Sequence, residues 1–205
     1  APDDPAPMRL SRSELFDLLA EECREARIDA RIVERYAALE LRDSEQLYLT
    51  STGGDWHKRV RYAIPYAHVT ANHGAETQVR SFLDAQQGGL ERLAHSGFTG
   101  CGKRLADEAL ELLGAPNCPS GCMDLLLMPD QMMLQIHESI GHPLELDRIL
   151  GDERNYAGTS FVTPDMFGTF RYGSPLLNVT FDPTPRHELA SFEFDDEGER
   201  AEKVW

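Results

Sequence analysis

The sequence predicts an α+β fold, in which antiparallel or mixed sheets pack against amphipathic helices. Two observations carry this prediction. Near the N-terminus and again after residue 100, apolar residues recur every three or four positions, which is the period of a helix. Between these two regions, apolar and aromatic residues alternate with polar ones, which is the period of a strand. Helices and sheet therefore occupy separate stretches of the chain, as in α+β proteins.

Two helices are predicted from their periods and from their ends. Ser11 with Glu14 three residues later fits a capping box and predicts a helix over about residues 12–27. Apolar residues from Leu105 to Leu113 lie at helical spacing and are closed by Gly114, which predicts a second amphipathic helix.

Three segments rich in β-branched and aromatic residues follow the first helix. They are expected to be strands of an antiparallel meander, and Gly53-Gly54 is expected to be a turn. The segments are residues 32–41, 46–52 and 59–71.

The second half of the chain predicts a short strand that leads into a helix. Met123–Met128 is apolar and bounded by a glycine and a proline, which favours a strand. Asp130 is then placed to cap a helix over about residues 131–140. Three further strands are expected at residues 170–172, 176–181 and 189–194. Such a sheet would be short of partner strands, so the chain is expected to be a fragment of a longer protein.

Composition limits the class of function. The chain has 205 residues, with 20 Lys and Arg against 35 Asp and Glu, which gives a net charge of −15. This excess of acids argues against nucleic acid as a partner, because binding to phosphates depends on clustered basic residues. The apolar stretches are too short to cross a bilayer and residues 1–7 do not resemble a signal peptide, so we expect a soluble cytoplasmic protein without a membrane partner.

The residues that best predict chemistry are His137, Glu138 and His142. Imidazole and carboxylate are the ligand and base chemistry of hydrolytic zinc sites, and this motif resembles HExxH with one residue more. At about 100° per residue, positions five apart lie roughly 140° apart on a regular helix. The helix must therefore deform or end. A break near Gly141 is expected, because Pro143 disfavours the α region at His142, and a π-bulge is the alternative.

A polar cluster follows the motif. Among Glu145, Asp147 and Arg148, a carboxylate could hold a ligand histidine by its second ring nitrogen. The alternative is a solvated loop with an ion pair.

The other candidate ligands lack a supporting pattern. Four cysteines in 205 residues are too few for a disulfide scaffold, and the spacing of Cys118 and Cys122 is not that of a CxxC pair, so reduced thiols are expected. The remaining histidines are expected to be surface or packed residues, and the sequon at Asn178 is expected to be part of a strand. These histidines are His57, His68, His73, His95 and His187.

Residues 137–148 and 157–161 together resemble the signature of the TldD/PmbA family, once called modulators of DNA gyrase and understood as zinc metallopeptidases. Residues 115–121 are similar to the family's approach to this motif, and residues 195–198 resemble its acidic turn downstream. The resemblance is strong from about Leu105 to Gly198.

The resemblance implies a zinc site with His137 and His142 as ligands and Glu138 as the general base. In the family, a cysteine near the end of a longer C-terminal domain completes the site, and this chain is expected to end before it. We therefore expect a lead-in over residues 1–10, an N-terminal α/β domain over 11–128 and the start of the metallopeptidase domain over 129–205.

The predicted function is that of a zinc metallopeptidase subunit that hydrolyses unstructured peptides. The resemblance also implies a homodimer, or a heterodimer with a TldE-like subunit. Two alternatives remain: a non-catalytic peptide-binding or scaffold subunit of such an assembly, and a domain that zinc stabilises without catalysis.

Overall fold

The structure is a computed structural model that describes residues 8–205, so residues 1–7 of the expected lead-in lie outside the described residues. The described chain divides into two compact units. One unit comprises the chain up to Asn117 together with Thr180–Trp205, and the other is Cys118–Val179. Helices and an antiparallel sheet occur as predicted, which confirms the α+β class.

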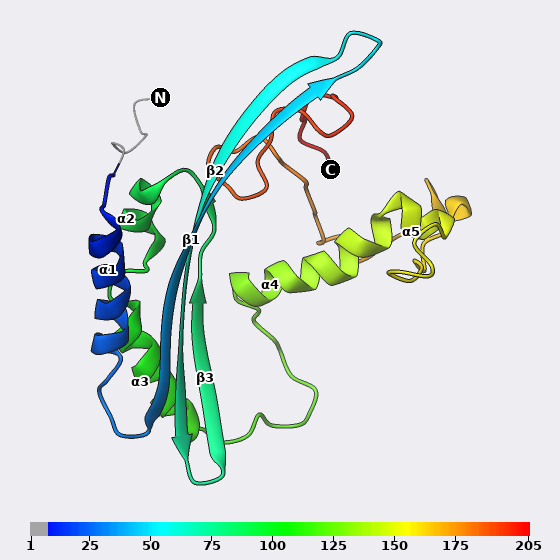
Figure 1. The fold of residues 1–205 in the computed structure, drawn as a ribbon. Helices are drawn as coiled ribbons and strands as arrows, with labels where there is room; N and C mark the ends of the chain where they lie inside the picture. Colours follow the sequence, from blue (N-terminus) through cyan, green and yellow to red (C-terminus); the bar gives the residue numbers. More distant parts are fainter. Residues whose placement is uncertain (1–7) are drawn as a thin grey trace. The chain divides into compact units, whose positions relative to one another are not determined.

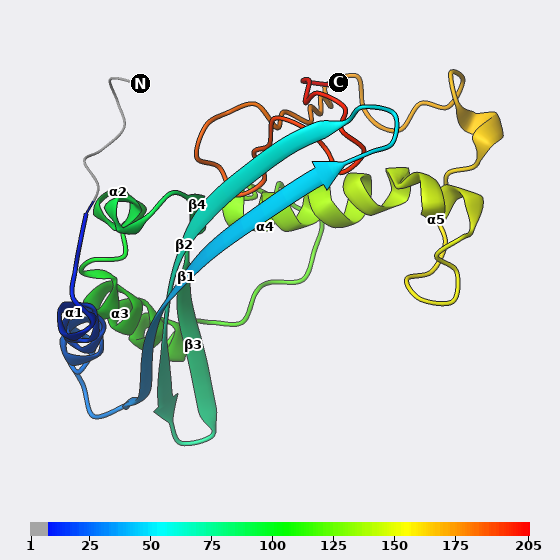
Figure 2. The same ribbon diagram turned by 45° about the horizontal axis from the view of Figure 1, so that its top comes forward.

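The first unit is an antiparallel sheet in the strand order β1-β2-β3, with β4 paired to β2. Figures 1 and 2 show its helices gathered along one side of this sheet. Its elements are α1 (Arg12–Glu25), β1 (Ile32–Leu49), β2 (Asp55–His73), β3 (Glu76–Leu83), β4 (Gln86–Gln87), a 3₁₀ turn (Leu90–Arg92), α2 (Leu93–Ser96) and α3 (Cys101–Leu113).

The predicted capping box begins α1. The backbone N–H of Ser11 donates to the Glu14 carboxylate at 2.7 Å, and the backbone N–H of Glu14 donates to the Ser11 hydroxyl at 3.3 Å. These two hydrogen bonds also lower the pKa of Glu14. Two otherwise unpaired donors of the first turn are satisfied in this way, so the sequence pattern is enough to set the start of the helix.

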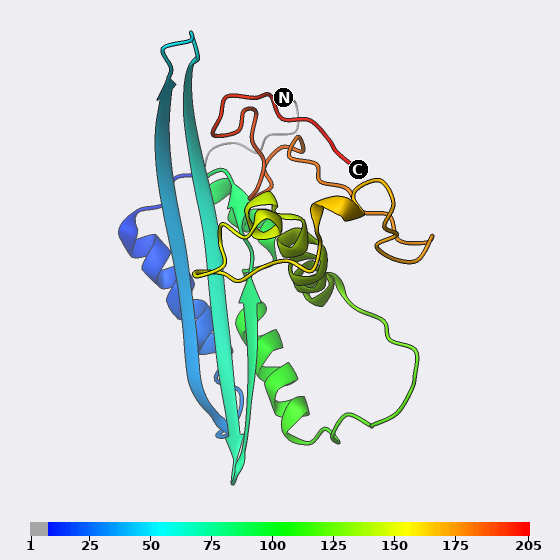
Figure 3. The same cartoon turned by 90° about the vertical axis from the view of Figure 1, so that its right-hand side faces the viewer.

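The long hairpin of β1 and β2 differs from the predicted meander in the extent of its strands. Residues 32–41 and 46–52 were expected as two strands, but β1 is continuous and pairs with β2 from Ile32 opposite Ala71 to Leu49 opposite Asp55. The turn around Gly53, whose φ is +101°, was predicted. β3 was not predicted, because its sequence is mostly polar, and it pairs only with residues 66–73 of β2 (Figure 3).

The core of this unit lies between the sheet and the helices. On β2, the buried side chains are small and alternate along the strand, and they include Ala67, Val69 and Ala71. Leu105 and Ala109 of α3 belong to the same buried cluster. Small side chains on the strand allow the helix axis to approach the sheet closely, and full burial of a leucine contributes about 1.5–3 kcal/mol to folding.

Two residues join α1 and α3 at the start of α3. Glu22 of α1 is buried, and its carboxylate accepts hydrogen bonds from the backbone N–H groups of Gly100 at 2.8 Å and Gly102 at 2.9 Å. One helix therefore supplies the N-terminal cap of the other. A Cβ at Gly102 would lie 2.0 Å from the carbonyl oxygen of Glu22, so only glycine permits this approach.

The second unit contains the motif, and its regular elements are helices and helical turns. Its elements are α4 (Pro129–Ile136), a π turn (His137–Gly141), a 3₁₀ turn (His142–Leu144), α5 (Leu146–Leu150) and a 3₁₀ turn (Pro164–Met166). The motif follows the strands in the chain, as expected, but Met123–Met128 itself is not a strand. In the structure this segment pairs with no strand, and its Leu125 and Leu126 side chains are exposed, so the apolar run was the wrong basis for a strand.

The start of α4 also corrects the prediction. The helix begins at Pro129, and Met128 takes the N-cap position rather than Asp130. Proline suits the first helical turn, because its fixed φ matches the helix and its missing N–H would lack a partner there in any case. Asp130 lies in that first turn, where its charge is favourable toward the helix dipole.

The three strands expected after residue 169 do not form. Residues 170–172 lie in irregular chain, and residues 176–181 and 189–194 make only one isolated bridge each. Phe181 bridges Val204 and Phe194 bridges Arg200. Prolines and turns interrupt this region at short intervals, and a proline cannot donate to a ladder of backbone hydrogen bonds.

Candidate metal centre

A π turn accommodates the five-residue spacing between His137 and His142. The helix does not break at Gly141: the chain continues from α4 through the π turn into the 3₁₀ turn. The backbone N–H of His142 donates to the carbonyl of His137, an i to i+5 bond. The wider turn absorbs the additional residue of the motif, so residues five apart come to lie one above the other. His142 itself is α-helical, with φ −57° and ψ −43°, which corrects the expectation that Pro143 would displace it.

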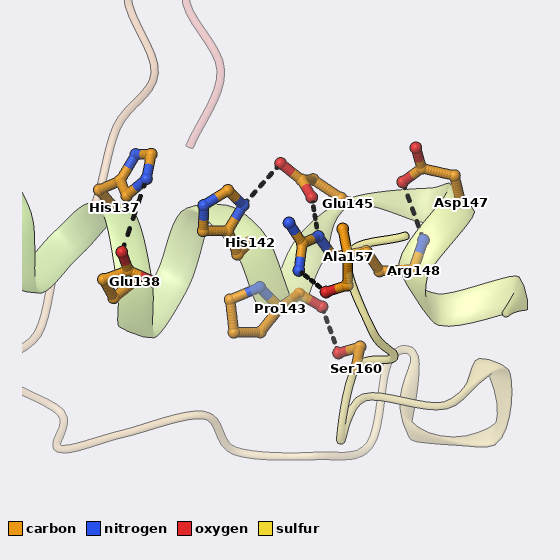
Figure 4. Close-up of polar contacts among 9 residues, drawn as sticks. All are labelled: His137, Glu138, His142, Pro143, Glu145, Asp147, Arg148, Ala157 and Ser160. Carbon is orange, nitrogen blue, oxygen red and sulfur yellow. Dashed lines mark hydrogen bonds and ion pairs between the residues drawn. The ribbon is translucent and has the colours of Figure 1, made fainter. Parts of the chain in front are cut away.

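The structure brings His137, Glu138 and His142 together. One potential ligand atom from each of the three lies within 4.8 Å of those of the other two. The imidazole rings meet edge to face, with centroids 4.3 Å apart (Figure 4). His137 and Glu138 are more than half exposed, and His142 is the least exposed of the three side chains. Two imidazoles and a carboxylate on an accessible surface are a donor set that suits a divalent transition metal such as zinc.

Glu145 contacts His142, the less exposed of the two motif histidines. Its Oε1 lies 2.9 Å from Nδ1 of His142, and its Oε2 accepts a hydrogen bond from Nε of Arg148. The hydrogen bond with His142, together with the hydrogen bond and the charge of Arg148, lowers the pKa of Glu145, so it is a carboxylate at neutral pH. The sequence left two outcomes open for this cluster, a carboxylate on a motif histidine or an ion pair, and Glu145 makes both contacts.

The chain after the motif folds back onto it. Nη1 of Arg148 donates to the carbonyl of Ala157 at 2.7 Å, and the hydroxyl of Ser160 donates to the carbonyl of Pro143 at 2.6 Å (Figure 4). Val162, two residues on, is buried. The segment around residues 157–160 is therefore part of the site's support.

Sequence reasoning missed the part that Tyr172 plays. The sequence placed it in a strand, but its hydroxyl donates to the carbonyl of Ser139 within the π turn. Burial raises the pKa of Tyr172, so the hydroxyl keeps its proton at neutral pH. The signal that could have revealed this need is Pro143: it stands four residues after Ser139 and has no N–H to offer that carbonyl.

The other candidates do not join the cluster. Cys118 and Cys122 are free and exposed, and none of the four cysteines shares a group of three or more potential ligands with other residues of the described chain. His57 lies 2.6 Å from a carboxylate oxygen of Glu45, and His68 stacks on Tyr36, so these are surface and packed histidines.

A cavity of about 490 Å³ lies elsewhere, in the first unit, where Trp56–Val60 face residues 183–194. It contains none of the motif residues. Cavity size alone favours that place as a binding site, but the cluster of potential ligands favours the motif. We give more weight to the ligand chemistry, because metal coordination needs particular donor atoms and not a particular volume.

Comparison with known proteins shows which family the chain resembles. Residues 120–204 match the model of the PmbA/TldA metallopeptidase C-terminal domain. This match and the curated relatives support a member of the TldD/PmbA family. This confirms the resemblance seen in the motif and the residues around it.

Curated relatives extend the match across most of the chain. A metalloprotease of Methanocaldococcus jannaschii is 26% identical over 167 residues, covering 78% of this chain and 33% of that protein. A metalloprotease of Methanothermobacter thermautotrophicus is 25% identical over 195 residues, covering 95% of this chain and 41% of the relative. A protein named metalloprotease TldD homolog, from Buchnera aphidicola, is 29% identical over 189 residues, covering 86% and 36%. The chain thus spans about a third to two fifths of the length of these relatives.

No solved structure matches the chain. Among residues 8–205, no helix is both long enough and apolar enough to cross a membrane.

Proposed function

We propose that this TldD/PmbA family chain carries part of the active site of a zinc-dependent peptidase that hydrolyses unstructured peptides. One observation carries the proposal: the π turn brings His137, Glu138 and His142 within 4.8 Å of one another on an accessible surface. The relatives named metalloproteases support the same class of reaction.

In this proposal the two imidazoles hold the metal and Glu138 moves the proton. Zinc, when bound, supplies a water of lowered pKa and polarises the scissile carbonyl. The Glu138 side chain is 61% exposed, and one of its carboxylate oxygens lies 3.8 Å from Nε2 of His137, so the carboxylate is accessible to a water beside the imidazoles. Glu138 accepts the proton of the attacking water at a carboxylate oxygen and donates it to the nitrogen of the leaving amine.

The remaining parts of the proposal come from the family resemblance. They are a cysteine of the longer C-terminal domain as the third ligand, and an assembly with a second copy or with a TldE-like subunit. A cytoplasmic location stays a prediction from the sequence. The domain division into residues 11–128 and 129–205 likewise stays a prediction.

Two substitutions test the roles of Glu138 as the base and His142 as a metal ligand. They are made in the longest natural protein that contains this sequence. Glu138→Gln is expected to keep about one zinc per chain and to lose peptide hydrolysis by at least ~100-fold, because amide nitrogen and oxygen cannot replace a general base. His142→Ala is expected to lose both zinc and activity. Zinc is measured by elemental analysis and hydrolysis with an unstructured fluorogenic peptide, and His73→Ala, an exposed histidine at the end of β2, serves as the control.

Each contrary result has a definite meaning. Peptidase activity that survives in Glu138→Gln would show that Glu138 is not the base. Wild-type protein that binds peptide but neither holds zinc nor cleaves would establish the alternative, a non-catalytic binding subunit. Unfolding on removal of zinc, in a protein that has no activity, would favour a structural metal.

A further inference from the structure

We infer that Glu145 and Arg148 together fix the tautomer and orientation of His142, so that the ring presents the lone pair of Nε2 to the metal. This inference rests on the proposed function for its purpose, but its structural part concerns the metal-free chain and is tested there. Glu145 and Arg148 are positioning residues, since neither belongs to the group of three potential ligands.

The first step of the argument is the chemistry of the hydrogen bond. A carboxylate can only accept hydrogen bonds, and one oxygen of Glu145 already accepts from Nε of Arg148. The other oxygen lies 2.9 Å from Nδ1 of His142, so the ring nitrogen must be the donor. A neutral imidazole carries one proton, and with that proton at Nδ1 the lone pair lies at Nε2. A metal requires that lone pair.

The second step concerns how Glu145 is itself held. The Arg148 side chain is only 18% exposed, whereas that of Glu145 is 43% exposed. The guanidinium group donates in two directions, from Nε to Glu145 and from Nη1 to the carbonyl of Ala157. A planar group with donors in fixed directions can span both acceptors, which a lysine ammonium cannot do in the same geometry.

The third step anchors the arrangement to the rest of the unit. The backbone N–H of Ser160 donates to the carbonyl of Arg148 at 3.3 Å, and the hydroxyl of Ser160 donates to the carbonyl of Pro143 at 2.6 Å. Pro143 directly follows His142. The chain therefore forms a closed path from His142 through Glu145, Arg148 and residues 157–160 back to the residue beside the histidine, which restricts rotation of the imidazole ring (Figure 4).

Nitrogen NMR of the histidine side chains tests the structural part in the metal-free chain. Above the titration of the imidazole, the ¹⁵N shifts of Nδ1 and Nε2 report which nitrogen carries the proton. In the wild type, we expect His142 to carry it mainly at Nδ1. Mainly Nε2–H in the wild type would overturn the inference, and this measurement needs no variant to fold.

Glu145→Gln provides the matched perturbation. The amide keeps the size of the side chain, but only its oxygen can accept from Arg148. Its NH₂ group then faces Nδ1 of His142 as a donor, which favours the ring proton at Nε2. We expect the population of Nε2–H at His142 to rise several-fold. Asp147→Asn is the control: it makes the same charge change two residues away, at a carboxylate whose hydrogen bond is to the backbone N–H of Arg148 at 2.8 Å. An unchanged tautomer in Glu145→Gln, or an equal change in Asp147→Asn, would overturn the inference.

Zinc affinity then tests the purpose of the arrangement. Partners that orient a metal-bound histidine typically contribute ~10–100-fold to affinity, and we expect Glu145→Gln to weaken zinc binding by that factor while Asp147→Asn does not. A tautomer change without any change in zinc affinity would overturn the positioning role. Absence of zinc binding in every form, wild type included, with the expected tautomers, would overturn the proposed function and leave the fixed tautomer of His142 established.

Discussion

Two neighbouring residues at the start of α3 show how size and protonation matter at the scale of a residue. Gly102 permits the backbone of α3 to approach that of α1, and Glu22 uses this approach to cap α3. Cys101, next to Gly102, is buried, and burial together with the nearby Glu22 charge raises the pKa of its thiol to about 12. Both properties lead to predictions.

Gly102→Ala is expected to destabilise the first unit by ~2 kcal/mol. Its Cβ would lie 2.0 Å from the Glu22 carbonyl oxygen, so the two helices must separate and the Glu22 cap must weaken. The free energy of unfolding, measured by urea denaturation, checks this. Gly114→Ala, at the other end of α3 where the nearest atom lies 3.7 Å away, should change it by less than ~0.5 kcal/mol. Equal effects of the two would contradict the close contact.

Alkylation by iodoacetamide at pH 8 should distinguish the thiols. Because a pKa of about 12 keeps Cys101 as the neutral thiol at that pH, it should stay unmodified in the folded chain. Cys118 and Cys122 are exposed and should be modified quickly. Mass spectrometry of peptides reads the result, and rapid labelling of Cys101 under native conditions would show that this part of the core opens readily.

At the scale of elements, the π turn is the feature on which the site depends. A regular α-helix would turn the two histidines to different faces, and the i to i+5 bond from His142 to His137 prevents this. Pro143 contributes, because without an N–H it cannot restore the α-helical bond to the carbonyl of Ser139. Tyr172 supplies the donor instead.

Tyr172→Phe should therefore loosen the π turn. Loss of this hydrogen bond is expected to cost about 1 kcal/mol, since water can partly replace the donor at the exposed Ser139. Hydrogen exchange of the backbone amides of residues 137–145 should become several-fold faster, as measured by mass spectrometry. Tyr156→Phe, which removes a hydroxyl from a residue that is 93% exposed, should leave it unchanged. Unaltered exchange in Tyr172→Phe would mean that the turn is stable without this contact.

At the scale of the whole molecule, the net charge of −15 opposes compactness. Raising the salt concentration from ~10 mM to ~150 mM shortens the screening length from about 30 Å to about 8 Å, which weakens repulsion between distant carboxylates more than contacts between close ion pairs. The melting temperature should rise by a few degrees over this range at pH 7. Thermal unfolding followed by circular dichroism, with sucrose as an uncharged control, checks this; a falling melting temperature would show that close ion pairs dominate.

Prediction from the sequence succeeded where local chemistry is sufficient. The capping box at Ser11 and Glu14, the stop of α3 at Gly114 and the turn at Gly53 each depend on neighbours a few residues away. Prediction failed where a strand needs a distant partner: Met123–Met128 and residues 170–172, 176–181 and 189–194 have apolar or β-branched residues but lack paired strands in the structure, while the polar β3 pairs along its length with β2. Strand formation depends on pairing, which a local pattern does not encode.

The sequence by itself determined the α+β class, the two amphipathic helices, the family motif and the three residues that would act on a metal. Only the tertiary structure decided between a break and a π turn, and it placed Glu145 on His142, Arg148 on Glu145 and Tyr172 on Ser139. The physical reason is that residue types and spacing specify which chemistry is available. The direction of each side chain depends on backbone hydrogen bonds and on contacts with residues as far away as 33 positions in the chain.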